Sequence, residues 1–162
     1  MIATVHKLPS RRVNRTVTLS RTSNADMRPS GENLSDEQVR ELIKAAGSNR
    51  YGKRDALMIG LAWHHGLRAS ELCGLTWDDV RGGRSPTLYI RRAKGGLSGC
   101  NPLSSEHLRA LNALRPEEPG PVIFTSERGD AFTPAGFAKM VQRAGVAAGL
   151  KFKVHPHQLR HA

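Results

Sequence analysis

The run of apolar residues between Lys53 and Trp63 constrains the fold more than any other feature of this chain. Its apolar positions, counting glycine, include Ala56, Leu57, Ile59, Gly60, Leu61 and Trp63. A surface helix carries one apolar stripe, whereas a helix that is apolar on most sides has to be buried. At 162 residues the chain is long enough for one domain with a real hydrophobic core. We therefore expect a helix over these residues at the centre of that core.

Start and stop signals place the other helices around this centre. Ser35 followed by Gln38 is a capping-box pattern, and the apolar spacing after it predicts a helix that ends at Gly47. Gly66 is expected to stop the central helix. Four further helices are predicted to begin near Ala69, after Ser104 or Ser105, at Pro134 and at Pro156. Helices therefore dominate the predicted structure.

Two short segments are typical of paired strands. Residues 87–92 and 100–103 favour extended structure, and the glycines between them favour a hairpin turn. Residues 122–124, Val-Ile-Phe, predict one more short buried strand. The predicted fold class is α+β, mainly α-helical with a small antiparallel sheet.

The charge of the chain predicts a polyanionic partner. Lys and Arg number 25 against 14 Asp and Glu, which gives a formal net charge of +11. Such an excess is typical of proteins that bind nucleic acids. A basic protein with no nucleic-acid role is the alternative that charge alone leaves open. The net charge alone therefore does not establish nucleic-acid binding, and a binding site has to support that prediction.

Residues 1–33 carry much of this charge in a segment with few large apolar residues. Six Lys and Arg face two acidic residues there, so the segment contributes +4 and the rest of the chain +7. We expect a flexible basic arm over 1–33 and a folded domain over 34–162. The arm would follow DNA phosphates, or it would be a solvated tail without a role.

The composition argues against membrane and secreted classes. No apolar run approaches the ~20 residues of a membrane span, and the N-terminus lacks the apolar stretch of a secretory signal. The two cysteines, Cys73 and Cys100, are too few for a disulfide framework and lack metal-ligand spacing. A reducing, cytoplasmic compartment is expected.

Two arginines, each inside a distinctive segment, point to the chemistry. Arg68 lies in residues 66–72, Gly-Leu-Arg-Ala-Ser-Glu-Leu, and Arg160 lies in residues 155–161, His-Pro-His-Gln-Leu-Arg-His. Guanidinium groups bind oxyanions bidentately, so two of them can converge on one phosphate. His157, one helical turn before Arg160, would point at the same spot. The combination predicts phosphoryl chemistry on a phosphodiester.

Each of these residues also has a simpler interpretation. Arg68 could pair with Glu71 on the surface, and Lys94 could be an exposed turn lysine. His157 and His161 have the spacing of zinc ligands, but no Glu follows His157 and no third ligand is obvious. Packing residues without a chemical role are expected at the remaining candidates, which are Tyr51, Tyr89, His64, His65 and His107.

Taken together, the motifs resemble the catalytic domain of the tyrosine recombinases, the phage-integrase family of DNA strand-exchange enzymes. The first motif spans residues 61–80 and the second residues 157–161, with Lys94 between them. The intervals, 26 residues from Arg68 to Lys94 and 63 from Lys94 to His157, suit the family. The resemblance covers residues 34–162. Residues 91–103 and the ending look most like the short recombinases that invert fimbrial promoter segments.

The resemblance implies a metal-free transesterification without a cofactor. In this family a tyrosine attacks the scissile phosphate of double-stranded DNA, which gives a 3′-phosphotyrosyl link and a free 5′-hydroxyl. Arg68 and Arg160 would hold the non-bridging oxygens and stabilise the charge of the transition state. Lys94 would protonate the departing 5′ oxygen, and His157 would manage the proton of the attacking phenol. The function implied is site-specific DNA recombination or integration by strand breaking and rejoining.

Supporting roles follow from the same resemblance. Glu71 would orient Arg68, and His161 would help to fix the helix that carries Arg160. Arg91 and Arg92 would contact DNA beside Lys94. The compartment implied is the cytoplasm of a bacterium, or of a phage host, in contact with the nucleoid.

One part of the family pattern is missing from this chain. The family places a His or Trp and then the nucleophilic tyrosine after the second motif, yet no tyrosine follows Tyr89 here. We therefore expect the recombinase fold without its C-terminal helices, no covalent DNA adduct, and self-association through the apolar surface so exposed. A truncated or inactive integrase that binds DNA is the first interpretation. The alternatives are a missing segment carried by another polypeptide, a catalytically dead relative that regulates an intact recombinase, and a DNA-binding regulator without recombinase chemistry.

Overall fold

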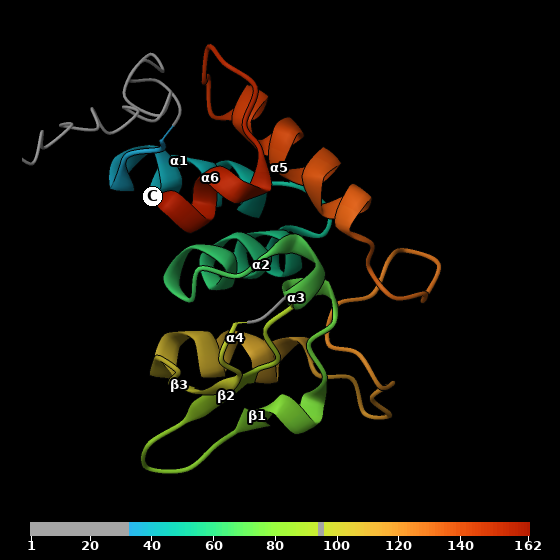
Figure 1. Ribbon diagram of the computed structural model, residues 1–162. Helices are drawn as coiled ribbons and strands as arrows, with labels where there is room; N and C mark the ends of the chain where they lie inside the picture. Colours follow the sequence, from blue (N-terminus) through green and yellow to red (C-terminus); the bar gives the residue numbers. More distant parts are fainter. Residues whose placement is uncertain (1–32, 94–95) are drawn as a thin grey trace, which may run out of the picture.

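The structure, a computed structural model, describes residues 33–93 and 96–162 (Figure 1). The helices of this part are α1 (Asp36–Gly47), α2 (Gly52–His64), α3 (Ala69–Cys73), α4 (Ser105–Leu114), α5 (Pro134–Ala147) and α6 (Pro156–His161). Each of the six helices predicted from the sequence is confirmed. The basic arm predicted over residues 1–33 falls outside the described residues, apart from Asn33.

Helix α2 is the centre of the core, as its composition predicts. Its residues Met58, Ile59 and Leu61 are fully buried, and it contacts α1, α3, α4 and α6. Burial of each such side chain stabilises the fold by about 1.5–3 kcal/mol. The other buried apolar side chains come from all the helices and from β2, so one continuous core holds the whole described domain together.

Local capping explains where the helices begin. The Ser35 hydroxyl accepts from the Gln38 N–H, and the Gln38 side chain accepts from the Ser35 N–H, which confirms the capping box. Ser104, rather than Ser105, caps α4 by accepting from the His107 N–H. These side chains satisfy N–H groups that the first turn of a helix leaves without a backbone partner.

A three-stranded antiparallel sheet lies against the helices, in the order β1-β2-β3. Its strands are β1 (Val80–Arg81), β2 (Thr87–Ile90) and β3 (Gly99–Pro102). Tyr89 pairs with Cys100 and Ile90 with Gly99, which confirms the predicted hairpin. Leu88 and Ile90 are fully buried, so one face of β2 belongs to the core. The loop after β2 brings Arg92 and Ala93 into contact with Glu71 of α3.

Two details of the sheet differ from the sequence prediction. Strand β1 and the 3-10 turn before it, η2 (Trp77–Asp79), are too short to leave a periodic signal. The strand predicted at residues 122–124 is wrong, because this segment makes only an isolated bridge between Thr76 and Val122. Its buried character is nevertheless right, since Phe124 is fully buried.

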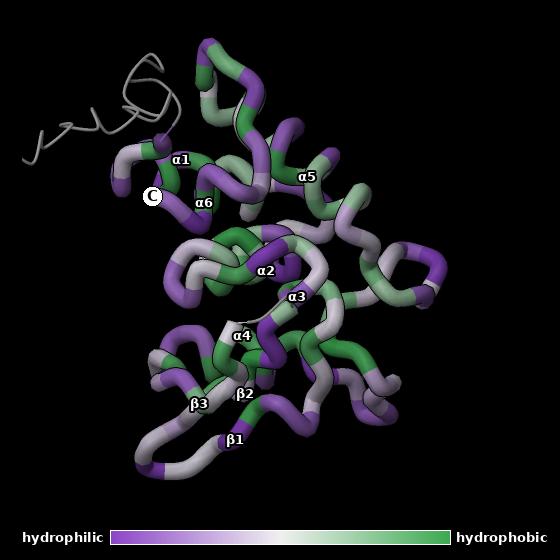
Figure 2. Tube along the Cα trace, in the orientation of Figure 1, coloured by the Kyte–Doolittle hydropathy of each residue, from purple (hydrophilic) through white to green (hydrophobic). Residues whose placement is uncertain are grey.

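The exposed elements have the expected polarity. Figure 2 shows hydrophobic and hydrophilic residues alternating along α1 and α5, whereas the loop between β1 and β2 is almost free of hydrophobic residues. Among the described helices, none is long and apolar enough to cross a membrane.

The central position of the core predicts a large difference between two leucine-to-alanine changes. Leu42 of α1 is fully buried, whereas Leu97 in the hairpin loop is 96% exposed. Leu42→Ala is expected to lower the free energy of unfolding by about 2–5 kcal/mol, because it removes buried methylene groups and leaves a cavity. Leu97→Ala should change it by less than about 0.5 kcal/mol. Urea denaturation measures both, and equal losses would show that α1 is not packed as described.

Candidate active site around Glu71

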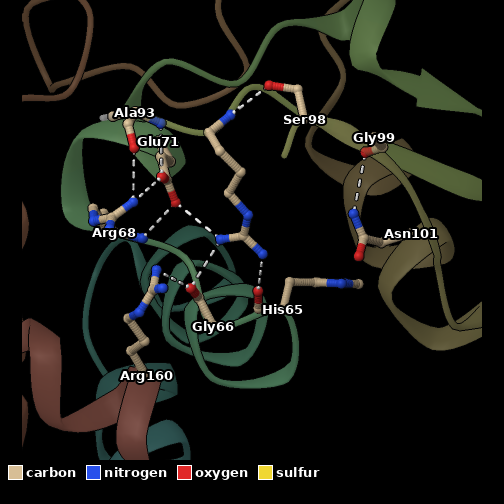
Figure 3. A network of polar contacts seen from close by, with 10 residues as sticks. His65, Gly66, Arg68, Glu71, Ala93, Ser98, Gly99, Asn101 and Arg160 are labelled. Atoms are coloured by element: carbon tan, nitrogen blue, oxygen red, sulfur yellow. Dashed lines mark hydrogen bonds and ion pairs between the residues drawn. The ribbon is translucent and has the colours of Figure 1, made fainter. Parts of the chain in front are cut away.

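A buried carboxylate, Glu71, organises the site. It lies in the first turn of α3, and its side chain is only 1% exposed. One carboxylate oxygen accepts from the Arg68 guanidinium at 2.9 Å and from the Ala93 N–H at 3.0 Å. The other accepts from the Arg68 N–H at 2.9 Å and from the Arg92 guanidinium at 3.1 Å. Figure 3 shows Glu71 between Arg68 and Ala93, so one side chain joins the first motif to the hairpin loop.

These contacts keep Glu71 ionised. Burial by itself raises the pKa of a carboxyl group, since it penalises the charged form. Hydrogen bonds from the backbone N–H groups of Arg68 and Ala93, and from the guanidinium groups of Arg68 and Arg92, outweigh burial and lower the pKa of Glu71 to about 2. The carboxylate is therefore a fixed negative charge at neutral pH.

The backbone carbonyl of Gly66 is the second acceptor that is shared by side chains of the site. It accepts from the Arg160 guanidinium at 2.9 Å and from the Arg92 guanidinium at 3.0 Å. Gly66 has a φ of 56°, in the left-handed region that favours glycine, and this conformation separates α2 from α3. Because the turn faces α6, the last helix can bring Arg160 to the first motif.

Arg68 and Arg160 therefore approach one network from two directions (Figure 3). The Arg68 side chain remains 41% exposed, so part of its guanidinium faces solvent while Nη1 is held by Glu71 and the Ala93 carbonyl. Arg68 and Arg92 bind the Glu71 carboxylate, and Arg160 binds the Gly66 carbonyl, which Arg92 also binds. The resulting excess of two positive charges suits a bound oxyanion. Arg68 and Arg160 thus belong to one hydrogen-bonded network through Arg92, and their joint action on one phosphate stays a prediction.

The histidines of the second motif are exposed at the surface. His157 and His161 are both exposed, and their rings are 6.2 Å apart between centroids. The His155 ring lies 6.2 Å from that of His157 on its other side. In the described structure no hydrogen bond or ring contact joins His157 to Arg68 or Arg160. The coordinates thus place His157 one turn from Arg160, open to solvent.

The two arginines of the hairpin have different surroundings. Arg91 forms an ion pair with Asp79 at 2.7 Å, but its side chain is 60% exposed and lies beside the Tyr89 ring. The Arg92 side chain is only 19% exposed and is bound to Glu71. Lys94, the expected general acid, lies outside the described residues.

A cluster of histidines near the site has no counterpart in the sequence prediction. The His107 ring lies 4.8 Å from that of His64 and 6.2 Å from that of His65. Burial lowers the pKa of His107, and burial together with the neighbouring imidazoles lowers that of His65 to about 4. The His65 ring is therefore neutral at pH 7. The sequence carries no signal for a contact between residues so far apart.

The geometry also bears on two other candidate roles, a zinc site and a nucleophilic tyrosine. No group of three or more His, Cys, Asp or Glu side chains within the described ranges is arranged to hold a metal ion. Tyr51 lies beneath Arg50 and Arg54, and Tyr89 lies beside Arg91. Neither tyrosine contacts Arg68 or Arg160 in the described part of the chain.

Comparison with known proteins decides the family. Residues 32–162 match the pattern of the Phage integrase family. The chain belongs to this family. It is 31% identical over 135 residues to the type 1 fimbriae regulatory protein FimB of Escherichia coli (strain K12), covering 80% of this chain and 67% of FimB. The resemblance to fimbrial recombinases is thereby confirmed.

Solved structures of this family confirm the fold. The XerA recombinase superposes with a TM-score of 0.68 at 30% identity, over 83% of this chain and 49% of XerA. The XerH site-specific recombinase, in a post-cleavage complex with palindromic difH, gives a TM-score of 0.63 at 25% identity, over 80% of this chain and 40% of XerH. The chain thus spans about half the length of XerA and a smaller share of XerH. It spans about two thirds of the length of FimB.

The ionised state of Glu71 predicts a pH-dependent contribution to stability. Its pKa is about 2 in the folded protein against an ordinary value of 4.5, so the unfolded chain binds more protons between these values. The contribution should be complete above about pH 4.5 and should disappear as the pH falls toward 2. Glu71→Gln is expected to lower the free energy of unfolding by about 2–3 kcal/mol at pH 7.

The measurement is chemical denaturation of both proteins at pH 7 and at pH 3. The gap between the wild type and Glu71→Gln should narrow at the lower pH. Glu41→Gln is the matched control, because Glu41 is more than half exposed and its ion pair with Lys44 is long at 4.0 Å. A gap that stays constant with pH would show that Glu71 is not held as a carboxylate.

Proposed function

We propose that this chain binds and activates a DNA phosphate for site-specific recombination, in which strands are broken and rejoined through a phosphotyrosine intermediate. The observation that carries the proposal is that Arg68 is held by Glu71 and Arg160 by the Gly66 carbonyl, two acceptors that Arg92 joins. Two guanidinium groups held at one place can bind the two non-bridging oxygens of a phosphodiester. They would stabilise the extra negative charge that develops as a nucleophile attacks phosphorus.

The other site residues complete this proposal. Glu71 fixes the orientation of Arg68, because it binds both the guanidinium and the backbone N–H of that residue. Lys94 would protonate the 5′ oxygen as it leaves, and His157 would assist the proton of the attacking phenol. The exposure of His157 supports a role toward a bound partner. His161 lies beside His157 and would limit its rotation.

Double-stranded DNA is the partner that we propose. The net charge of +11 supports it, and the related XerH is bound to its difH DNA substrate. Arg91 is exposed beside the site and can contact a phosphate there. Other recombinase subunits are proposed as further partners, and exposed apolar residues such as Val146 of α5 offer contact surface for them. We place this function in the cytoplasm.

Two arginine changes test the phosphate site. Arg68→Ala and Arg160→Ala should each weaken binding to a labelled DNA duplex about tenfold, and each should reduce the slope of log affinity against log salt by about 1, because one phosphate contact is lost. Fluorescence anisotropy over a range of KCl concentrations measures both quantities. Arg40→Ala, which removes the same charge from the exposed face of α1, is the control. Equal losses of affinity in all three variants would show that the chain binds DNA through non-specific charge alone.

The positions of the tyrosines favour a second candidate, a DNA-binding protein that occupies sites without cleaving them. Neither Tyr51 nor Tyr89 contacts the arginine pair in the described structure. This polypeptide, assayed alone, would then act as an inactive integrase that holds DNA. Footprinting distinguishes the candidates, since protection of a defined site without cleavage supports the regulator.

Covalent trapping on DNA tests whether this chain alone can cleave a strand. On a nicked suicide DNA substrate the 162-residue chain should form no adduct that survives denaturation with SDS, because no tyrosine stands at the arginine pair. Gel electrophoresis of labelled DNA is the measurement. An adduct that is lost in Tyr51→Phe or Tyr89→Phe would overturn the expectation and identify the nucleophile.

A further inference from the structure

We propose that Arg92 is a positioning residue for both arginines of the site, rather than a contact to DNA. The inference rests on the proposed function, since it concerns how that function's two phosphate-binding groups are held. It replaces the role expected for Arg92 from its place beside Lys94. Arg92 would act on the phosphate only through Arg68 and Arg160.

The guanidinium of Arg92 has three acceptors, which come from the two ends of the turn between α2 and α3. It donates to Glu71 at 3.1 Å, to the Gly66 carbonyl at 3.0 Å and to the His65 carbonyl at 3.0 Å. The first acceptor is the carboxylate that holds Arg68. The second is the carbonyl that holds Arg160. Arg92 is thus the described side chain that touches both anchoring groups.

Electrostatics gives this placement a consequence. If Arg68 alone faced Glu71, the carboxylate would neutralise most of the positive charge that Arg68 offers to an oxyanion. Arg92 shares the carboxylate and also the partial negative charge of the Gly66 carbonyl. Charge on Arg68 and Arg160 therefore remains available to the phosphate, in a partly buried place where screening by salt is weak.

The hairpin loop is shaped to hold the stem of Arg92. The Arg92 N–H donates to the Ser98 hydroxyl at 3.0 Å across the loop. A Cβ atom at Gly96 would lie 2.8 Å from the Cβ of Arg92, which is closer than real Cβ contacts, and 3.2 Å from its Cγ, which is tight. A side chain at position 96 would therefore displace Arg92 without changing any charge. This close approach is an observation independent of the three hydrogen bonds.

Comparison with Arg91 separates the two possible roles. Arg91 is 60% exposed and Arg92 is 19% exposed, although they are neighbours in the chain. Each described contact of the Arg92 guanidinium is made to an acceptor inside the protein. A planar guanidinium can serve several fixed acceptors at once, whereas a lysine ammonium is a point charge on a flexible stem. Lysine should therefore replace an arginine that only attracts phosphate, but not one that spans three acceptors.

The experiment compares lysine rescue at positions 91 and 92, with DNA affinity measured by anisotropy over a range of KCl concentrations. Arg92→Ala and Arg92→Lys should both weaken binding about tenfold, with a fall in salt slope of about 1 to 2, because both arginines behind them lose their orientation. Arg91→Lys should retain most of the affinity that Arg91→Ala loses. Rescue by Arg92→Lys would overturn the inference.

A triple variant shows whether Arg92 acts through Arg68 and Arg160. Arg92→Ala should weaken binding much less in a protein that already carries Arg68→Ala and Arg160→Ala than in the wild type. A loss that adds fully would mean that Arg92 contacts DNA directly. If Arg68→Ala and Arg160→Ala themselves have no effect, the proposed function fails; if they have their effect and Arg92→Lys binds like the wild type, only the present inference fails.

Gly96→Ala keeps the inference testable if a change at Arg92 prevents folding. It retains every charge and should still weaken DNA binding, because it moves the stem of Arg92. Gly99→Ala in β3 is the matched control, since a Cβ there meets nothing within 4 Å. Circular dichroism and thermal melting check that both variants are folded. Wild-type affinity in folded Gly96→Ala would contradict the inference.

Discussion

The site depends on the interaction between the buried, charged Glu71 carboxylate and the donors around it. An isolated carboxylate in the core would be costly, and this one is stabilised by two guanidinium groups and two backbone N–H groups. Those donors come from the start of α3 and from the hairpin loop. The same charge that needs compensation therefore joins the hairpin of the small sheet to the start of α3, beside a net positive group of arginines.

The packing of the helices, rather than the charge of Glu71, places Arg160 in the site. Helix α2 fills the core and ends at Gly66, whose backbone conformation turns the chain toward α3. Helix α6 packs against α2 and carries Arg160 to the Gly66 carbonyl. Two residues that lie 94 positions apart in the chain thus meet at one hydrogen bond. The chain belongs to the Phage integrase family, and this membership supports the proposal that these positive side chains act on a phosphodiester.

Local signals were sufficient for much of the fold. The caps at Ser35 and Thr133 and the glycine at position 66 each act within a few residues, so the sequence reveals them. Long-range contacts were harder to predict. The burial of Arg92 depends on carbonyl groups more than 20 residues away, and residues 122–124 form a bridge rather than a strand because their neighbour is Thr76. The convergence of Arg68 and Arg160 was predicted only because both lie in recognisable motifs.

The central claim is that Arg68 and Arg160 act on one phosphate. A crystal structure of this chain with duplex DNA tests it most directly, through the distances from both guanidinium groups to phosphate oxygens. The account predicts that nitrogen atoms of both side chains lie within about 2.7–3.2 Å of oxygens of a single phosphate. Contacts to two different phosphates, or an arginine pair turned away from the DNA, would contradict it.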